Sequence, residues 1–208
     1  SILMELAEQA PEDLEVLHGL RAGDSEDEDW AGVADVCRRL AEVDSGPQQI
    51  EAALALLQAC SELEHPEDAR EGLEVARRAQ PEAAGELRDA LRVIYEALEA
   101  DSELADVLLD DAQYDEDDAS RLEILRRAGE LFLNVEDTEG AIPVLEEVYR
   151  LDPTDHDTVV ILADAHMMTG NLDQADSLLD QVIAGFRKKR SPEIAFFHHC
   201  KARVASAR

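Results

Sequence analysis

The segment AIPVLEEVYRLDP, residues 141–153, has the pattern of a helix that ends at Leu-Asp-Pro. Counting back from Pro153, small or apolar residues recur at helical spacing in two stretches, which the turn-forming sequence NVEDTEG separates. Residues three or four apart share one face of a helix, so the pattern predicts two helices joined by a turn, with Asp137 as N-cap of the second. The residues of the two stripes are Leu125, Ala128, Gly129, Phe132, Ala141, Leu145 and Val148.

The same pattern occurs at two other places in the chain. Counting the same offsets back from Pro81 gives a matching set, and so does a shift of 34 residues towards the C-terminus, where Arg187 replaces the final proline. A pattern that returns at a fixed interval indicates an array of structural repeats. The two sets are Ala53, Leu56, Leu57, Cys60, Ala69, Leu73 and Ala76, and Val159, Leu162, Ala163, His166, Ala175, Leu179 and Val182.

This spacing resembles that of the tetratricopeptide repeat (TPR), a helix–turn–helix unit of about 34 residues. The small pair Ala128-Gly129 suits such a unit, because two helices approach closely only where their side chains are short. The aromatic residue that the family usually has at the first position is absent from all three repeats. The resemblance implies an all-α fold, a right-handed superhelical solenoid of antiparallel helix pairs.

The rest of the chain fits the repeat less tightly. Val33 and Cys37 are followed 72 residues later by Ala105 and Leu109, so two longer units alternate with the regular ones. We expect a single TPR-like array over residues 1–208, forming part of a longer array because it starts and stops within a repeat. Its units are the half-repeat 1–11, repeats at about 12–48, 50–83, 84–119, 122–155 and 156–189, and the half-repeat 190–208.

Charge restricts the class of partner. The chain has 49 Asp and Glu residues against 19 Lys and Arg, a net charge of -30. Nucleic acids and anionic membranes bind cationic surfaces, so we expect neither as a partner. Residues 187–208 differ, with seven Lys or Arg and the single acid Glu193. This basic tail is either a docking patch for an acidic partner, a second copy included, or a solvated helix end. The overall acidity also fits a salt-rich environment, in which carboxylates keep a protein hydrated.

The three cysteines, Cys37, Cys60 and Cys200, are widely spaced within helical patterns. Their odd number and spacing argue against a disulfide framework and favour a reducing compartment. The sequence SILMELAEQAPEDLEV at the start has no basic region, and no run of 18 uncharged apolar residues occurs anywhere. We therefore expect neither a signal peptide nor a membrane span in these residues, and a cytoplasmic location.

Known catalytic and metal-binding motifs are absent from the sequence. There is no GxxxxGK[ST], GxGxxG, GxSxG or HExxH pattern. In HHC, residues 198–200, neighbouring side chains point about 100° apart on a helix, so at most two could bind one ion. An EF-hand loop starting at Asp111 fails because its sixth and twelfth positions hold Glu116 and Leu122. We expect a protein that is not an enzyme and that holds no cofactor or metal.

The resemblance implies that the first helix of each repeat lines a concave face, which binds a protein or peptide. Arg126 could pair with an acidic group of such a partner, and Met167 and Met168 could adapt to an apolar side chain or instead fill the interface between repeats. We expect a scaffold or adaptor, with end-to-end self-association as the alternative. The predicted partner-binding residues are Leu54, Gln58, Arg126, Glu130, Leu133, Val160, Asp164, Met167 and Met168.

Overall fold

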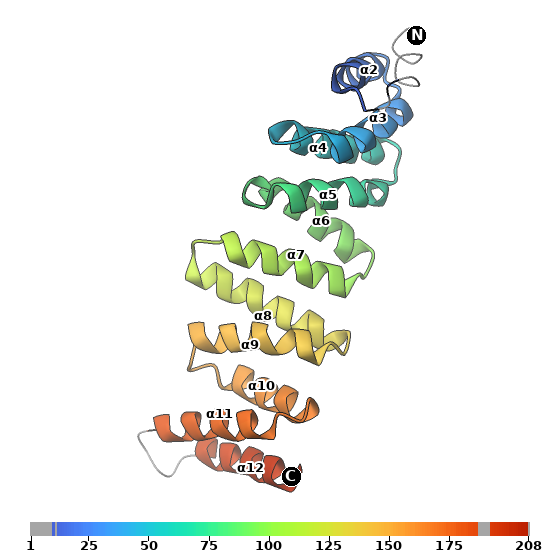
Figure 1. Ribbon diagram of the computed structural model, residues 1–208. Helices are drawn as coiled ribbons and strands as arrows, with labels where there is room; N and C mark the ends of the chain where they lie inside the picture. The colour runs from blue at the N-terminus through green and yellow to red at the C-terminus, as the bar shows by residue number, and fades with distance from the viewer. Residues whose placement is uncertain (1–9, 11, 187–191, 208) are drawn as a thin grey trace. The chain divides into compact units, whose positions relative to one another are not determined.

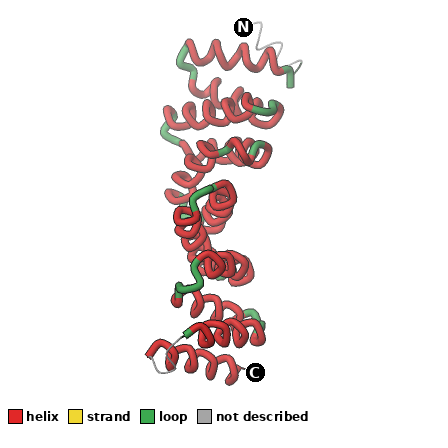
Figure 2. Tube along the Cα trace, turned by 90° about the vertical axis from the view of Figure 1, so that its left-hand side faces the viewer, coloured by secondary structure: helices red, strands yellow, loops and turns green. Residues whose placement is uncertain are grey.

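The computed structural model describes residues 10, 12–186 and 192–207, and within them it contains helices joined by turns and no strand (Figures 1 and 2). The predicted all-α fold of helix pairs is confirmed. Apart from Ala10, the predicted half-repeat 1–11 lies outside the described residues, as do the basic residues 187–190. None of the described helices is both long and apolar enough to cross a membrane. The chain divides into two compact units, Ser1–Ala100 and Asp101–Arg208.

In the first unit each α-helix packs against the one that follows it in the chain. Leucines from successive helices, such as Leu17, Leu40, Leu56 and Leu73, are fully buried and form the core between them. Two short 3-10 helices, η1 (Pro66–Ala69) and η2 (Pro81–Ala83), flank α5. The α-helices are α2 (Leu14–Glu26), α3 (Trp30–Val43), α4 (Pro47–Glu62), α5 (Arg70–Ala79) and α6 (Gly85–Ala97).

The second unit is built in the same way, and α10 also contacts α12. Its fully buried side chains include Leu108, Val148, Leu162, Leu179 and Phe197. The helices are α7 (Asp101–Tyr114), α8 (Asp118–Asn134), α9 (Thr138–Leu151), α10 (His156–Met168), α11 (Leu172–Gly185) and α12 (Pro192–Ala207).

One turn recurs between successive helices. At each occurrence one residue adopts a left-handed backbone, with φ between 53° and 77°. Its N–H bonds to a carbonyl three residues back, and the next N–H bonds to a carbonyl five residues back, as for Asp137 and Phe132 at 2.9 Å. This pair of bonds is the Schellman motif, which satisfies the carbonyls at a helix end. The left-handed residues are Glu28, Glu64, Glu99, Glu136 and Gly170, spaced 36, 35, 37 and 34 residues apart.

The residue after the left-handed one is the N-cap of the next helix in several of these turns. Asp137 accepts a hydrogen bond from the N–H of Gly140 at 2.9 Å, which confirms the predicted N-cap. Asp29 does the same for Gly32 at 3.1 Å. In these two turns, three residues end one helix, reverse the chain and cap the next.

Small residues set the distance between paired helices. A methyl group on Gly129 of α8 would lie 3.0 Å from Leu145 Cδ2 of α9, and one on Gly72 of α5 would lie 2.6 Å from Leu56 Cδ2 of α4. Ala128 is fully buried beside Gly129. The short side chains at this predicted pair thus allow the close approach that was expected of them.

Several predicted repeats each span two consecutive helices of one unit. Residues 12–48 span α2 and α3, 50–83 span α4 and α5, 122–155 span α8 and α9, and 156–189 span α10 and α11, while α12 lies within 190–208. The boundary between the two compact units lies between α6 and α7, inside the predicted repeat 84–119. The organisation of residues 1–208 as a single array stays a prediction.

Candidate protein-binding surface

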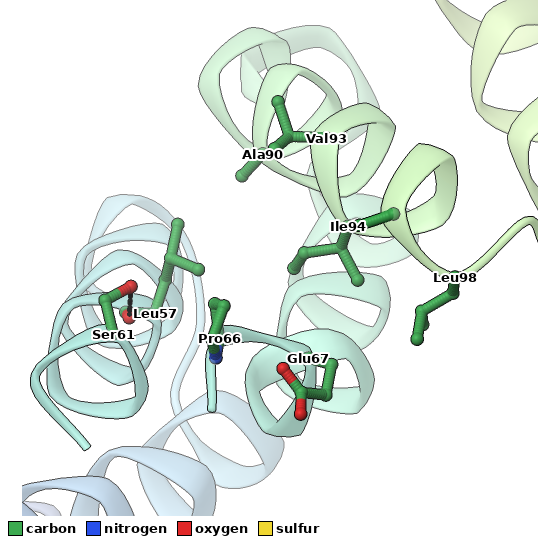
Figure 3. A pocket seen from close by; sticks show the side chains of 9 residues that line it. Leu57, Ser61, Pro66, Glu67, Ala90, Val93, Ile94 and Leu98 are labelled. Atoms are coloured by element: carbon green, nitrogen blue, oxygen red, sulfur yellow. Dashed lines mark hydrogen bonds between the residues drawn. The ribbon is translucent and has the colours of Figure 1, made fainter. Parts of the chain in front are cut away.

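An apolar pocket of about 340 Å³ lies in the first unit between α4, η1 and α6. Figure 3 shows Leu57 and Ser61 of α4 on one side of it and Ala90, Val93 and Ile94 of α6 on the other. The lining residues are Leu57, Ser61, Pro66, Glu67, Ala90, Val93, Ile94, Ala97 and Leu98.

The pocket forms because α6 carries apolar residues on two of its faces. Leu87 and Leu91 are fully buried in the core of the unit. A second stripe, at Ala90, Val93 and Ala97, follows helical spacing along the pocket wall. Its two alanines have short side chains and fill little of the space between the helices, so the pocket stays open.

Large apolar side chains remain in contact with solvent at this place. Val93 is 67% exposed, and Leu98, at the C-cap of α6, is 44% exposed. Single exposed apolar residues are common, but neighbouring ones around a pocket mark an interaction site more often than chance.

The two chain segments that form the pocket are acidic. Residues 57–68 contain no Lys or Arg, and residues 90–99 contain one, Arg92, which pairs with Asp89 of the same helix. Hydrogen bonds from its own backbone N–H and from His65, whose Nδ1 lies 3.4 Å away, lower the pKa of Glu67, so this lining residue stays ionised. The carboxylates of the two segments are all exposed, and they are Glu62, Glu64, Glu67, Asp68, Glu96 and Glu99.

Of the predicted partner-binding residues, two lie on α4. Leu54 is half-buried and Gln58 is exposed. Neither lines the pocket, whereas Leu57 and Ser61 of the same helix do. The contribution of α6 was missed because its repeat is one of the irregular ones, in which no register was assigned. The apolar stripe of α6 was the signal that could have found it.

In the second unit the structure places Arg126, Glu130 and Leu133 on one face of α8. Arg126 is already engaged, since its Nη2 lies 2.8 Å from Asp155 Oδ2 and 3.3 Å from Asp152 Oδ2. Both acids belong to the link between α9 and α10. The guanidinium therefore holds this link in place within the chain.

The predicted residues of α10 are Val160, Asp164, Met167 and Met168. The carboxylate of Asp164 pairs with Arg203 of α12 at 3.1 Å. Met168 is 75% exposed, whereas Val160 and Met167 are half-buried. The α10 face thus offers an exposed methionine beside an internal ion pair. Whether any of the nine residues contacts a partner stays a prediction.

His166, also on α10, is a buried ring. Its Nδ1 has no hydrogen-bond partner, and its Nε2 lies 3.7 Å from Glu146 Oε1. Burial lowers the pKa of His166, and the nearby Glu146 offsets only part of this effect. The ring is therefore neutral at pH 7 and acts as a packed side chain, as the apolar stripe suggested.

The described residues hold no group of three side chains able to bind a metal ion. Cys37, Cys60 and Cys200 are free and buried. Burial raises the pKa of the Cys37 thiol to about 11, which keeps it protonated and poorly nucleophilic at pH 7.

Comparison with known proteins agrees with this helical-repeat architecture. Residues 133–194 match the family model described as tetratricopeptide repeat. The resemblance to that family is confirmed, and α9, α10 and α11 lie within the matched stretch. No curated protein matches the chain.

The chain is also similar to several solved structures. A MamA structure has a TM-score of 0.39 at 15% identity and covers 86% of this chain and 97% of its own. The yeast Tom70 structure has a TM-score of 0.38 at 15% identity, covering 99% of this chain and 42% of its own. PilF of Pseudomonas aeruginosa has a TM-score of 0.38 at 16% identity, covering 93% of this chain and 87% of its own.

Proposed function

We propose that this protein is a non-catalytic scaffold or adaptor that binds a protein or peptide on the face formed by the first helices of its repeats. The family match supports a general protein-binding role. The observation that carries the proposal is the apolar pocket between α4 and α6, both of which are first helices of predicted repeats.

The energetics require a partner that reaches beyond the pocket. Fully burying one large apolar side chain contributes about 1.5–3 kcal/mol, whereas micromolar affinity needs about 8 kcal/mol. Leu54 and Gln58 extend the same side of α4 and offer further contacts. In the second unit, Met168 offers an exposed, adaptable apolar side chain on α10.

The alternative is a structural element that associates with other copies of itself. Phe196, 50% exposed on α12, favours this alternative because it leaves an aromatic surface open. The charges of the tail favour the adaptor instead. Lys201 pairs with Asp176 at 3.2 Å and Asp180 at 2.6 Å, so this cation is used within the chain and not on an acidic neighbour.

Affinity capture from a lysate of the source cell tests the proposal, with the unchanged chain compared with Val93→Glu and Met168→Glu. Both side chains are exposed, so these changes alter the surface and leave the core intact. Val43→Glu, at the end of α3, is the matched control. A protein retained by the unchanged chain and the control, and lost from either variant, supports a binding face.

Light scattering over a concentration series separates the two functions. An adaptor stays monomeric, whereas self-association raises the mean mass with concentration. The adaptor proposal would be overturned if all four chains captured the same proteins. It would also be overturned if the mean mass of the unchanged chain rose with concentration and that of a Phe196→Glu variant did not.

A further inference from the structure

We propose that the pocket between α4 and α6 accepts a large apolar side chain from a partner protein in which the neighbouring residues are Lys or Arg. This inference rests on the proposed function and names the chemistry of the partner. It follows from the size of the pocket, the polar groups it lacks and the charges that surround it.

The pocket is small, and its lining is too apolar to favour a cofactor. Its volume of about 340 Å³ is at the low end of the roughly 300–1,000 Å³ found for small-molecule sites. Ser61 is one of its two polar side chains, and its hydroxyl donates to the Leu57 carbonyl at 2.7 Å (Figure 3). With that donor occupied, no set of polar groups converges to orient a polar ligand. An apolar side chain fits this lining well, because it brings no polar group that would be buried without a hydrogen bond.

The surrounding charge selects what lies next to that side chain. Glu67, the other polar residue of the lining, is ionised, and the segments 57–68 and 90–99 carry six exposed carboxylates against one cation, Arg92, which already pairs with Asp89. A partner with acidic residues beside its apolar anchor is repelled, and one with Lys or Arg is drawn in. The apolar contact supplies the anchor and the charges supply orientation and association rate.

The basic tail of a second copy has a similar composition, because Phe186 directly precedes residues 187–190, which are Arg, Lys, Lys and Arg. The ring of Phe186 is already used within its own chain. Its centroid lies 5.2 Å from that of His156 and 5.9 Å from that of Phe197. A separate protein is therefore the occupant that these contacts favour.

Fluorescence anisotropy with labelled synthetic peptides tests the inference on the whole chain. The probe is a nonapeptide with a central Phe flanked by two Lys or Arg on each side, in otherwise Gly and Ser sequence. One matched peptide replaces Phe by Ala, and a second replaces the basic residues by Glu. Since a chain of charge -30 attracts any cationic peptide, the Ala peptide measures the contribution of charge alone.

One protein variant blocks the pocket and a second serves as its control, and both leave the core intact. Ala97→Trp fills it from the last residue of α6, and Ala79→Trp, at the exposed last residue of α5, is the matched control. We expect the Phe peptide to bind about tenfold or more tightly than the Ala peptide. We expect Ala97→Trp, but not Ala79→Trp, to abolish that difference, and the Glu peptide not to bind.

Equal binding of the Phe and Ala peptides, or a Phe preference that survives Ala97→Trp, overturns the inference. So does a concentration-dependent dimer in the unchanged chain that Ala97→Trp dissociates, because the occupant is then a second copy. Lysate capture separates these results from failure of the proposed function. If Ala97→Trp loses a captured protein while no basic peptide prefers Phe, the adaptor function stands and the partner chemistry is wrong.

Discussion

Arg126 and Asp155 lie 29 positions apart in the chain and meet through two hydrogen bonds, from Nη2 at 2.8 Å and from Nε at 3.1 Å, both to Asp155 Oδ2. The same carboxylate accepts from the Thr158 hydroxyl at 2.7 Å, and its other oxygen accepts from the N–H groups of Asp157 and Thr158. Asp155 therefore caps α10 and ties the start of that helix to α8.

Asp155→Ala should lower the free energy of unfolding by about 1–2 kcal/mol, since it removes both the cap and the ion pair. Arg126→Ala should lower the free energy of unfolding by less, because the Asp155 cap of α10 survives. Urea denaturation followed by circular dichroism measures both. Equal losses in the two variants would show that the cap contributes nothing beyond the pair.

The Asp155 carboxylate also predicts a pH dependence. Burial opposes its ionisation, but hydrogen bonds from Thr158 and Arg126 outweigh this and lower the pKa of Asp155. The unfolded chain then binds the proton more readily, so this contribution to stability is present above the unfolded pKa of about 3.9 and is lost as the pH falls through the folded value. The difference in stability between the unchanged chain and Asp155→Ala should narrow from pH 7 to pH 3.

Glu136 has φ of 62° in the turn between α8 and α9. A side chain in this region is strained, and a carboxylate at a helix C-terminus meets the negative end of the helix dipole. Glu136→Gly should raise the free energy of unfolding by about 1 kcal/mol. Glu139→Gly, in the first turn of α9, is the control and should lower it by about 0.5–1 kcal/mol. Thermal melts of the two variants should therefore shift in opposite directions.

His166→Phe should stabilise the second unit by about 1 kcal/mol, because it removes a buried Nδ1 that has no hydrogen-bond partner. The lowered pKa of His166 gives the sign of the pH effect. The unfolded chain takes up the proton first, so the unchanged protein loses stability as the pH drops below about 6.5. The His166→Phe variant should lose less stability over the same drop in pH. His166→Gln keeps a polar group that does not titrate, and it should flatten the pH profile without a gain at pH 8.

Two glycine substitutions should have opposite signs. A methyl group on Gly72 would meet the fully buried Leu56 at 2.6 Å, so Gly72→Ala should cost about 1–3 kcal/mol. Gly23 in α2 has no atom within 4 Å of that position, so Gly23→Ala should stabilise by about 0.5–1 kcal/mol. Chemical denaturation of the purified variants checks both signs.

The sequence predicted the features that depend on local spacing. The helix pairs, the Asp137 cap and the close contact at Gly129 all follow from residues within one repeat, and the structure contains each of them. The ion pair of Arg126 with Asp155 joins α8 to the N-cap of α10, so the spacing of apolar residues that defines the repeats could not reveal it. Arg126 was instead predicted to be available to a partner.

The pocket could not be predicted from the sequence, for a different reason. Val93 and Ala97 lie in an irregular repeat, and their exposure depends on how far α6 stands from α4. That distance is set by packing with α5 and by the turn at η1, which a count of apolar residues does not contain. Space between helices is a tertiary property.

The three-residue turn that ends one helix and caps the next also bears on how this chain folds. Within each unit the helices pack chiefly on their neighbours in sequence, so little entropy is lost in closing long loops before contacts form. Such low contact order favours fast folding that can start at any pair and spread along the chain. Each helix pair then has its own stability. The protection of backbone amides from hydrogen exchange should therefore change in steps along the sequence and should not be lost in a single event.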